Sequence, residues 1–265
     1  MNNSSDNKGK KILGYLFPGL ITLLVMLIVL VAKGIWPFGS SRIDLFDNMQ
    51  QVAPLYAHLW DAMHGDASIW FDWYTGLGTN VSMSMSAFSM ISPFNLFLYL
   101  CPRDYILEFI SVLTVIKTFV MSVTMYAFIN KRYNSLSYNI KALFAVAYAF
   151  CGYVLLYASC FTPWMDIVAL FPLLMMALDV MEKTGKKLFY IIMVAVMFII
   201  NYYLAAMSLV YILLVGGMYL IFMCDKKERC KKAWNVGIGT FTGIALSAFM
   251  LIPVFAQLSQ SQRTG

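Results

Sequence analysis

Long apolar segments separated by short basic clusters are the feature that most constrains how this chain folds. The first segment, Ile12–Ala32, contains no charged residue and is long enough to cross a bilayer core of about 30 Å, which takes roughly 20 helical residues. It is also longer than the roughly 7–15 apolar residues of a signal peptide. Hydrophobic residues make up 61% of the chain and charged residues only 12%, unlike a soluble domain. We therefore predict an all-α, polytopic membrane protein with an uncleaved first helix.

The basic residues indicate the topology. The formal net charge is +6, but most Lys and Arg residues lie in clusters at 8–11, 131–141, 183–187 and 226–232. Such clusters are typical of cytoplasmic loops, so we attribute the charge to topology and not to nucleic-acid binding. If every cluster is cytoplasmic, an even number of helices separates each pair. This condition predicts about seven spans, with the N-terminus in the cytoplasm and the C-terminus outside.

The predicted spans divide the chain into three parts: a cytoplasmic tail (1–11), a helix bundle (12–253) and an outer segment (254–265). The first span is followed by a large outer loop, residues 33–104, and the second span runs from about Tyr105 to Ile129. Two pairs of spans follow, joined near residues 159–163 and 201–206, and a last span runs from about Ala233 to Pro253.

The outer loop is predicted to contain short helices. Residues 44–59 and 61–70 are expected to form amphipathic helices at the membrane surface. Residues 82–100 are apolar, but their serines and Pro93 make a poor lipid-facing helix. We therefore expect a re-entrant or interfacial segment there, because an eighth span would also place the next basic cluster outside the cell.

The outer loop also contains the polar residues from which a site can be built. Asp47 comes roughly fifteen residues after the first span and is followed one helical turn later by Gln51. Asp44 lies one turn earlier on the same face. A solvated helix face or an N-cap is the structural alternative for both aspartates. His58 and His64 lack the i, i+4 spacing of a helical metal pair, and we expect both at the surface.

A set of short motifs occurs in a fixed order along most of the chain. They are Trp36-Pro37-Phe38-Gly39, Asp47-x-x-x-Gln51-x-Ala53-Pro54, Gly76-Leu77-Gly78-x-Asn80, Ser92-Pro93-Phe94-Asn95, Trp164-x-Asp166 with Pro172-Leu173, and Asn201-Tyr202-Tyr203. Together they resemble the N-terminal part of the bacterial YfhO family. Two departures stand out: Val52 occupies the position of a usual tyrosine, and family members are several times longer. We therefore expect a fragment or a truncated chain.

The resemblance implies a GT-C-like fold and an integral membrane glycosyltransferase. Such an enzyme takes a sugar from a polyprenyl-phosphate carrier and adds it to a cell-envelope acceptor outside the cell, such as teichoic acid. The implied location is the bacterial cell membrane, and the implied partners are the lipid-linked donor, membrane lipid and the polymer acceptor, without nucleic acid. No cofactor is assigned, and a divalent metal is left as an option.

The resemblance assigns Asp47 as the catalytic base, because it matches the family motif and follows the first span on the outer side. Candidate substrate-binding residues are Asp44, Gln51, Arg103, Lys117, Asp166, Asn201 and Tyr202. Asp166, Asn201 and Tyr202 fall at outer ends of helices, where helix starts and interfacial anchoring are the structural alternatives. Arg103 next to Asp104 is a phosphate contact or an anchor at the membrane boundary.

Lys117 lies near the middle of the second span, where an ionisable residue costs at least ~2.5–3.5 kcal/mol without a partner. It is therefore expected to face the bundle interior, either in contact with the carrier phosphate or its counter-ion, or in a structural pair with Asp166 or a helix-capping carbonyl oxygen. About twelve residues into the helix, it should lie about 18 Å below the surface. We expect Asp47 and Asp166 at the rim of a funnel and Lys117 at its floor.

Two other classes of function stay open. A transporter or flippase would explain a lysine within the membrane and a re-entrant segment, although the spans show no inverted repeat. A non-catalytic membrane protein of envelope assembly is the second alternative.

Overall fold

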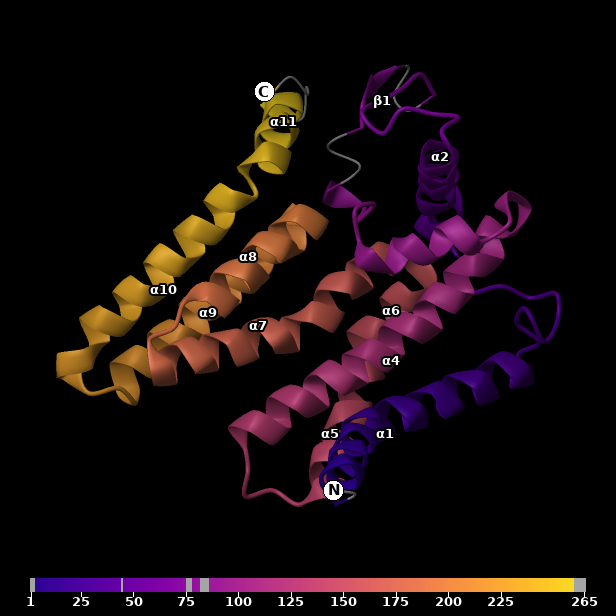
Figure 1. Ribbon diagram of the computed structural model, residues 1–265. Coiled ribbons are helices and arrows are strands. Elements are labelled where there is room, and N and C mark those ends of the chain that lie inside the picture. Colours follow the sequence, from indigo (N-terminus) through magenta and orange to yellow (C-terminus); the bar gives the residue numbers. More distant parts are fainter. Residues whose placement is uncertain (1–2, 44, 75–77, 82–85, 260–265) are drawn as a thin grey trace. The chain divides into compact units, whose positions relative to one another are not determined.

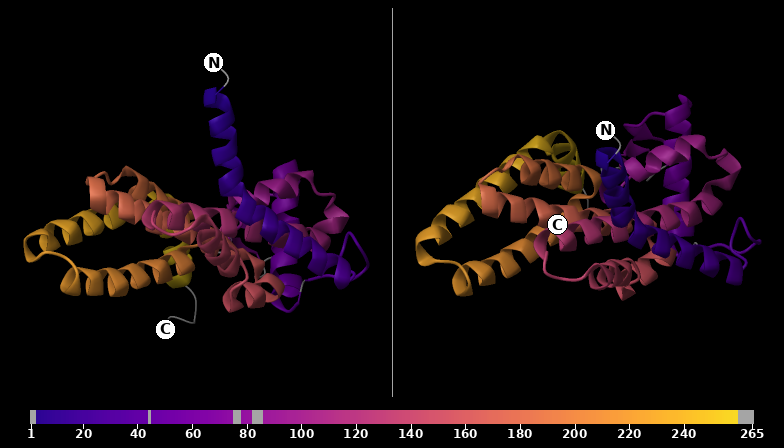
Figure 2. Two further views of the ribbon diagram at one scale, coloured as in Figure 1. Left: turned by 90° about the horizontal axis from the view of Figure 1, so that it is seen from below. Right: turned by 60° about the horizontal axis from the view of Figure 1, so that its bottom comes forward.

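The computed structural model describes residues 3–43, 45–74, 78–81 and 86–259, and these residues are mostly helical (Figures 1 and 2). The chain divides into two compact units. The first comprises residues 1–57 and 94–173, and the second comprises residues 58–93 and 174–265. The helical content confirms the all-α fold class.

The first unit is a bundle of apolar helices with a polar segment between the first two long helices. Its elements are α1 (Asn3–Ala32), η1 (Asn48–Val52), η3 (Pro93–Leu100), η4 (Arg103–Tyr105), α4 (Ile106–Arg132), α5 (Tyr138–Ala149), α6 (Gly152–Cys160) and η5 (Thr162–Trp164). Two helices cross from this unit into the second one: α2 (Ala53–His64) and α7 (Met165–Thr184).

Helices α1, α4 and α5 pack against one another in the first unit (Figure 1). Gly19 allows α1 to approach α4 closely, because a Cβ atom there would lie 2.7 Å from a methyl group of Val123. Aromatic rings also connect the two helices: Tyr15 packs edge-on against Tyr126, with ring centroids 5.4 Å apart. Asn130 donates a hydrogen bond of 2.8 Å to the Tyr15 hydroxyl. These contacts fix α1 and α4 side by side.

Besides the ends of α2 and α7, the described residues of the second unit form a small hairpin and the helices α8 to α11. These elements are β1 (Phe71–Asp72), β2 (Thr79–Asn80), α8 (Leu188–Ile200), α9 (Tyr202–Phe222), α10 (Lys226–Leu246) and α11 (Ala248–Ser259). The two strands pair antiparallel. Helix α10 packs against α8 through Gly239 and Gly243, where an added Cβ would lie 2.8 Å from Tyr190 and 2.7 Å from Val194. Glycine is required there because any side chain would separate the helices.

Each of the seven predicted spans corresponds to helical structure. Five helical segments among the described residues are long and apolar enough to cross a membrane: Ile12–Ala32, Arg103–Arg132, Tyr138–Cys160, Thr162–Thr184 and Tyr202–Phe222. Helices α10 and α11 form a sixth candidate, bent by 75° at Ser247. The remaining helix, α8, is apolar but has only 13 residues. At ~1.5 Å per residue it covers about 20 Å, less than a bilayer core.

Several predicted boundaries are wrong in detail. Helix α1 begins at Asn3, within the predicted tail, and α10 begins at Lys226, before Ala233. In the outer loop, one continuous helical stretch, η1 and α2, covers residues 48–64, whereas we predicted two helices at 44–59 and 61–70. Of residues 82–100, 82–85 lie outside the described part, and Pro93–Leu100 form a 3-10 helix.

Candidate functional site

Asp47 and Gln51 form an exposed pair at the start of the outer helical stretch. Asp47 precedes η1, a short π-helix, and its Oδ1 accepts a hydrogen bond of 2.7 Å from Nε2 of Gln51. The predicted spacing of one turn therefore brings the two side chains into direct contact. The amide orients the carboxylate and leaves its second oxygen available for another partner. Asp44 lies outside the described residues.

Asn48 anchors this pair to the rest of the first unit. Its side chain is fully buried and donates to the carbonyl oxygens of Ala158, at 3.3 Å, and Ser159, at 2.8 Å. Its Oδ1 accepts a bond of 2.8 Å from the backbone N–H of Thr162. The backbone N–H of Leu45 also donates to Ser159. Asn48 thus provides hydrogen-bond donors for carbonyl groups at the end of α6, which have no partner within the helix. These bonds also fix the position of its neighbour Asp47.

Lys117 and Asp166 form an ion pair beneath this anchor. The Lys117 amine lies 2.6 Å from Oδ1 of Asp166 and donates to the carbonyl oxygen of Thr162 at 3.1 Å. Both side chains have no exposed surface. Thr162 therefore joins the two groups: its N–H donates to Asn48 and its carbonyl oxygen accepts from Lys117. Of the predicted roles for Lys117, the structural ones are present in this structure, since its amine contacts both Asp166 and a backbone carbonyl oxygen.

The funnel that we predicted from helix positions is wrong for Asp166. Asp166 was expected at an outer rim, but it is buried in direct contact with Lys117. The reason is the turn before α7, whose residues Thr162 and Pro163 are themselves buried. A turn that folds into the unit carries the first residues of the next helix inward with it. Asp47 is partly exposed, as expected for a residue at the surface.

Tyr56 and Asn95 also belong to this buried polar cluster. Tyr56 lies on α2 and is fully buried. Burial raises the pKa of its phenol well above the usual value, the Asp166 carboxylate raises it further, and the nearby side chain of Asn95 acts in the opposite direction. The phenol therefore stays protonated at neutral pH. Phe94 covers the cluster, with its ring centroid 5.8 Å from the Lys117 amine, an arrangement that favours the cation.

Arg103 lies beside an apolar groove of the first unit. This groove has a volume of about 410 Å³ and is lined by Trp36, Phe97, Leu100, Cys101, Pro102, Tyr105, Phe109, Val112 and Ile116. Arg103 is exposed in η4, next to Pro102 and one turn before the buried part of α4. Arg42, from the segment that leads to Asp47, contacts Glu108 at 3.9 Å. The groove and the Asp47 segment are therefore parts of one unit.

Asn201 and Tyr202 belong to the second unit, where the contacts of Asn201 are structural. Its buried side chain accepts from the backbone N–H of Leu204 at the start of α9 and donates to the carbonyl oxygen of Ala87 and to Ser89. It is an N-cap and a clamp for residues 86–89. The Tyr202 N–H donates to Ser86. A substrate contact by Asn201 or Tyr202 stays a prediction.

The two histidines have separate local partners. His58 lies 2.9 Å from the carbonyl oxygen of Ser68, and His64 stacks on Trp60 with ring centroids 3.7 Å apart. Among the described residues, no three His, Cys, Asp or Glu side chains are grouped as metal ligands. Gly76 and Leu77 lie outside the described part of the chain, and Gly78 has a φ of +96°, which is typical of a glycine in a turn.

We predict that Asn48→Ala lowers the free energy of unfolding by about 1–3 kcal/mol, because it leaves the buried Thr162 N–H without its acceptor. The midpoint of thermal unfolding in detergent measures this loss. Gln50→Ala is the matched control, since Gln50 is exposed in the same helical turn. Equal midpoints for the two variants would contradict the anchoring role of Asn48.

Helices long and apolar enough to span a membrane, a buried ion pair between two of them and a polar segment after the first define an all-α polytopic membrane protein. Residues 19–265 match the family described as bacterial membrane protein YfhO. The match covers most of the chain, so this protein belongs to that family. Searches of curated proteins and of solved structures gave no significant match.

Proposed function

We propose that this protein is an integral membrane glycosyltransferase that moves a sugar from a polyprenyl-phosphate carrier to an acceptor outside the cytoplasm. The observation that carries the proposal is the Asp47–Gln51 pair, an oriented carboxylate at the surface of the first unit. Asn48 fixes its position through three hydrogen bonds. A base held in place before the substrates arrive is what transfer to a hydroxyl group requires.

In the proposed reaction, Asp47 takes the proton of the acceptor hydroxyl group as its oxygen attacks the anomeric carbon of the donor sugar. The bond between that carbon and the carrier phosphate breaks, and the phosphate leaves with the electron pair. Gln51 orients the carboxylate throughout. A direct contact between Lys117 and the phosphate would require the pair with Asp166 to open, so we assign that pair a supporting role.

The apolar groove beside Arg103 supports a lipid-linked donor. Its aromatic and aliphatic lining is suited to an isoprenyl chain, and its volume lies within the range of roughly 300–1,000 Å³ found for ligand pockets. Arg103, which follows the lining residue Pro102 in the chain, is the group that would bind the carrier phosphate, because an arginine forms paired hydrogen bonds with phosphate oxygens. Asp44 is the second candidate for the base, from the same segment.

The proposal is tested by supplying the full-length protein in nanodiscs with a radiolabelled polyprenyl-phosphate hexose and purified teichoic acid. We expect labelled polymer to form with this donor and not with a nucleotide sugar. A transporter or flippase would move the intact carrier lipid across vesicles without labelling the polymer. An assembly protein would do neither, and either of these two results would overturn the proposal.

A further inference from the structure

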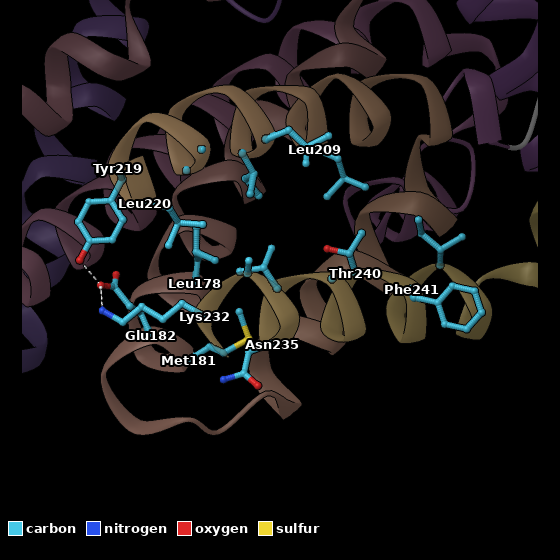
Figure 3. A pocket seen from close by; sticks show the side chains of 18 residues that line it. Leu178, Met181, Glu182, Leu209, Tyr219, Leu220, Lys232, Asn235, Thr240 and Phe241 are labelled. Carbon is cyan, nitrogen blue, oxygen red and sulfur yellow. Dashed lines mark hydrogen bonds and ion pairs between the residues drawn. The ribbon is translucent and has the colours of Figure 1, made fainter. Parts of the chain in front are cut away.

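The second unit contains an apolar groove that the proposed reaction does not use. It lies between α7, α9 and α10 (Figure 3) and has a volume of about 470 Å³. Its lining is almost entirely hydrophobic, with Leu178, Leu209, Leu213, Leu220, Phe241 and Ile244 among the side chains that form it. A cavity of this kind does not hold water well, because it lacks polar partners for it.

Glycines open the groove on two of its walls. A Cβ atom added to Gly217 on α9, or to Gly237 on α10, would meet no neighbouring atom within 4 Å. The other glycines of α10 behave differently, since Gly239 and Gly243 are packed tightly against α8. On one face of α10, glycines allow close contact with α8. On another face, Gly237 leaves space in the groove. Gly217 and Gly237 cost helix stability without any gain in packing inside the unit.

One end of the groove is polar. Glu182 of α7 accepts a hydrogen bond from the Tyr219 hydroxyl and lies 3.2 Å from the amine of Lys232. Lys232 also contacts Glu228, at 3.3 Å, and lies over the ring of Tyr219. Figure 3 shows Tyr219, Glu182 and Lys232 grouped at this end, away from Thr240 and Phe241. The side chain of Lys232 keeps 22% of its surface exposed, and its amine is paired with both Glu182 and Glu228.

The sequence around this polar end is strongly basic. Residues 182–187 and 225–232 contain eight Lys and Arg residues against three acidic ones. The acidic residues Glu182 and Glu228 are already paired with Lys232. Lys183 is likewise paired with Asp179, so the positive charge left for an anion near this end of the groove comes from the other lysines of the two segments, Lys186, Lys187, Lys226, Lys227 and Lys231.

We propose that this groove binds an anionic phospholipid such as phosphatidylglycerol, with one acyl chain between α9 and α10 and the phosphate at the basic end. The apolar lining matches the chain, and the charge matches the headgroup. Basic pockets between membrane helices at the cytoplasmic side are known to bind anionic lipid headgroups. A bound chain also fills the space that Gly217 and Gly237 leave open. The site does not depend on sugar transfer.

Photolabelling tests this site directly. The full-length protein is placed in nanodiscs that contain phosphatidylglycerol with a photoreactive acyl chain, and labelled peptides are located by mass spectrometry. We expect labels on the parts of α9 and α10 that line the groove. Phosphatidylcholine with the same chain should label about fivefold less, as expected from roughly one favourable lysine–phosphate interaction.

Two variants of α10 separate binding in the groove from general contact with lipid. Gly237→Leu places a side chain in the groove and should lower labelling there by roughly tenfold, the loss expected when about two methylene groups are no longer buried. Ala245→Leu adds an apolar side chain at an exposed position of α10 outside the groove lining and should leave labelling unchanged.

Three results would overturn the proposal. Undiminished labelling in Gly237→Leu would show that the chain lies elsewhere. Equal labelling by the two headgroups would show that no anion is recognised. Absence of labels from the groove in the wild-type protein would show that another occupant, such as a protein segment, fills it. Thermal unfolding of both variants shows that each is folded before labelling, and Gly237→Leu should be at least as stable as the wild type because leucine favours a helix over glycine.

Discussion

Asp47→Asn is expected to lower the rate of sugar transfer by about 10²–10⁴-fold, the usual contribution of a general base. The asparagine oxygen can still accept the hydrogen bond that Gln51 donates, so the helical turn and the anchor at Asn48 are retained. Only the ability to take a proton is lost. The experiment measures initial rates with labelled donor and acceptor in the full-length protein.

Asp66→Asn is the matched control for this variant, because Asp66 is an exposed aspartate in the same outer loop. It should transfer sugar at the wild-type rate. Both variants should show the thermal unfolding midpoint of the wild type, since neither carboxylate is buried. A normal rate for Asp47→Asn would remove Asp47 from the reaction and leave Asp44 as the candidate base.

Lys117→Met is expected to destabilise the protein by about 3–5 kcal/mol, because it leaves the buried carboxylate of Asp166 without its cation. It also removes the hydrogen bond to the Thr162 carbonyl oxygen. Methionine has a similar length, so little of the effect comes from a cavity. The loss is measured as a lower midpoint of thermal unfolding and a lower yield of folded protein from membranes.

The double variant Lys117→Met/Asp166→Leu distinguishes the charge from the packing. Replacing a whole buried pair by apolar residues is often neutral or stabilising, so the double variant should regain most of the stability lost in Lys117→Met. If Lys117→Met alone does not fold, recovery of folded protein in the double variant still tests the role of the buried charge. A double variant that is less stable than Lys117→Met would mean that the pair is not the reason for the loss.

The helical class and the order of the spans could be predicted because apolar length and the positions of basic residues act locally. The spacing of Asp47 and Gln51 likewise follows from helical periodicity, and their contact is within one turn. Lys117 was expected in the interior because an unpaired cation is costly in the membrane. Its pairing with Asp166 was one of several roles left open, and the sequence could not choose among them.

Asn48 was not identified from the sequence, although it connects the outer segment to the buried pair. Its partners, Ala158, Ser159 and Thr162, lie more than 100 residues away along the chain. No local pattern marks such a contact, and an asparagine between Asp47 and Gln51 looks like an ordinary surface residue. The same reason explains the wrong depth of Asp166. Helix length gives a position along an axis, but it does not show that the preceding turn folds inward.

Tyr56 was missed for a related reason. It lies in the outer loop, where a tyrosine suggests an interfacial anchor, yet it is fully buried beside Asn95 and Asp166. The clue available in the sequence was its position on the same helical stretch as Val52 and Ala53, which are also buried. That apolar face predicts burial, but not which polar groups lie beneath it.

The shortness of α8 has a consequence for the surrounding bilayer. A 13-residue helix leaves a hydrophobic mismatch of about 10 Å against an average hydrocarbon core. Polar contacts follow at the C-terminal end of α8: Ser86 donates to the Phe198 carbonyl oxygen, and Asn201 donates to Ala87 and Ser89. Lipids next to a short span respond by local thinning. Where the exposed side chains of α8, such as Leu188 and Ile192, face lipid, the membrane is therefore expected to be indented, so that lipid headgroups lie closer to the midplane there than elsewhere around the protein.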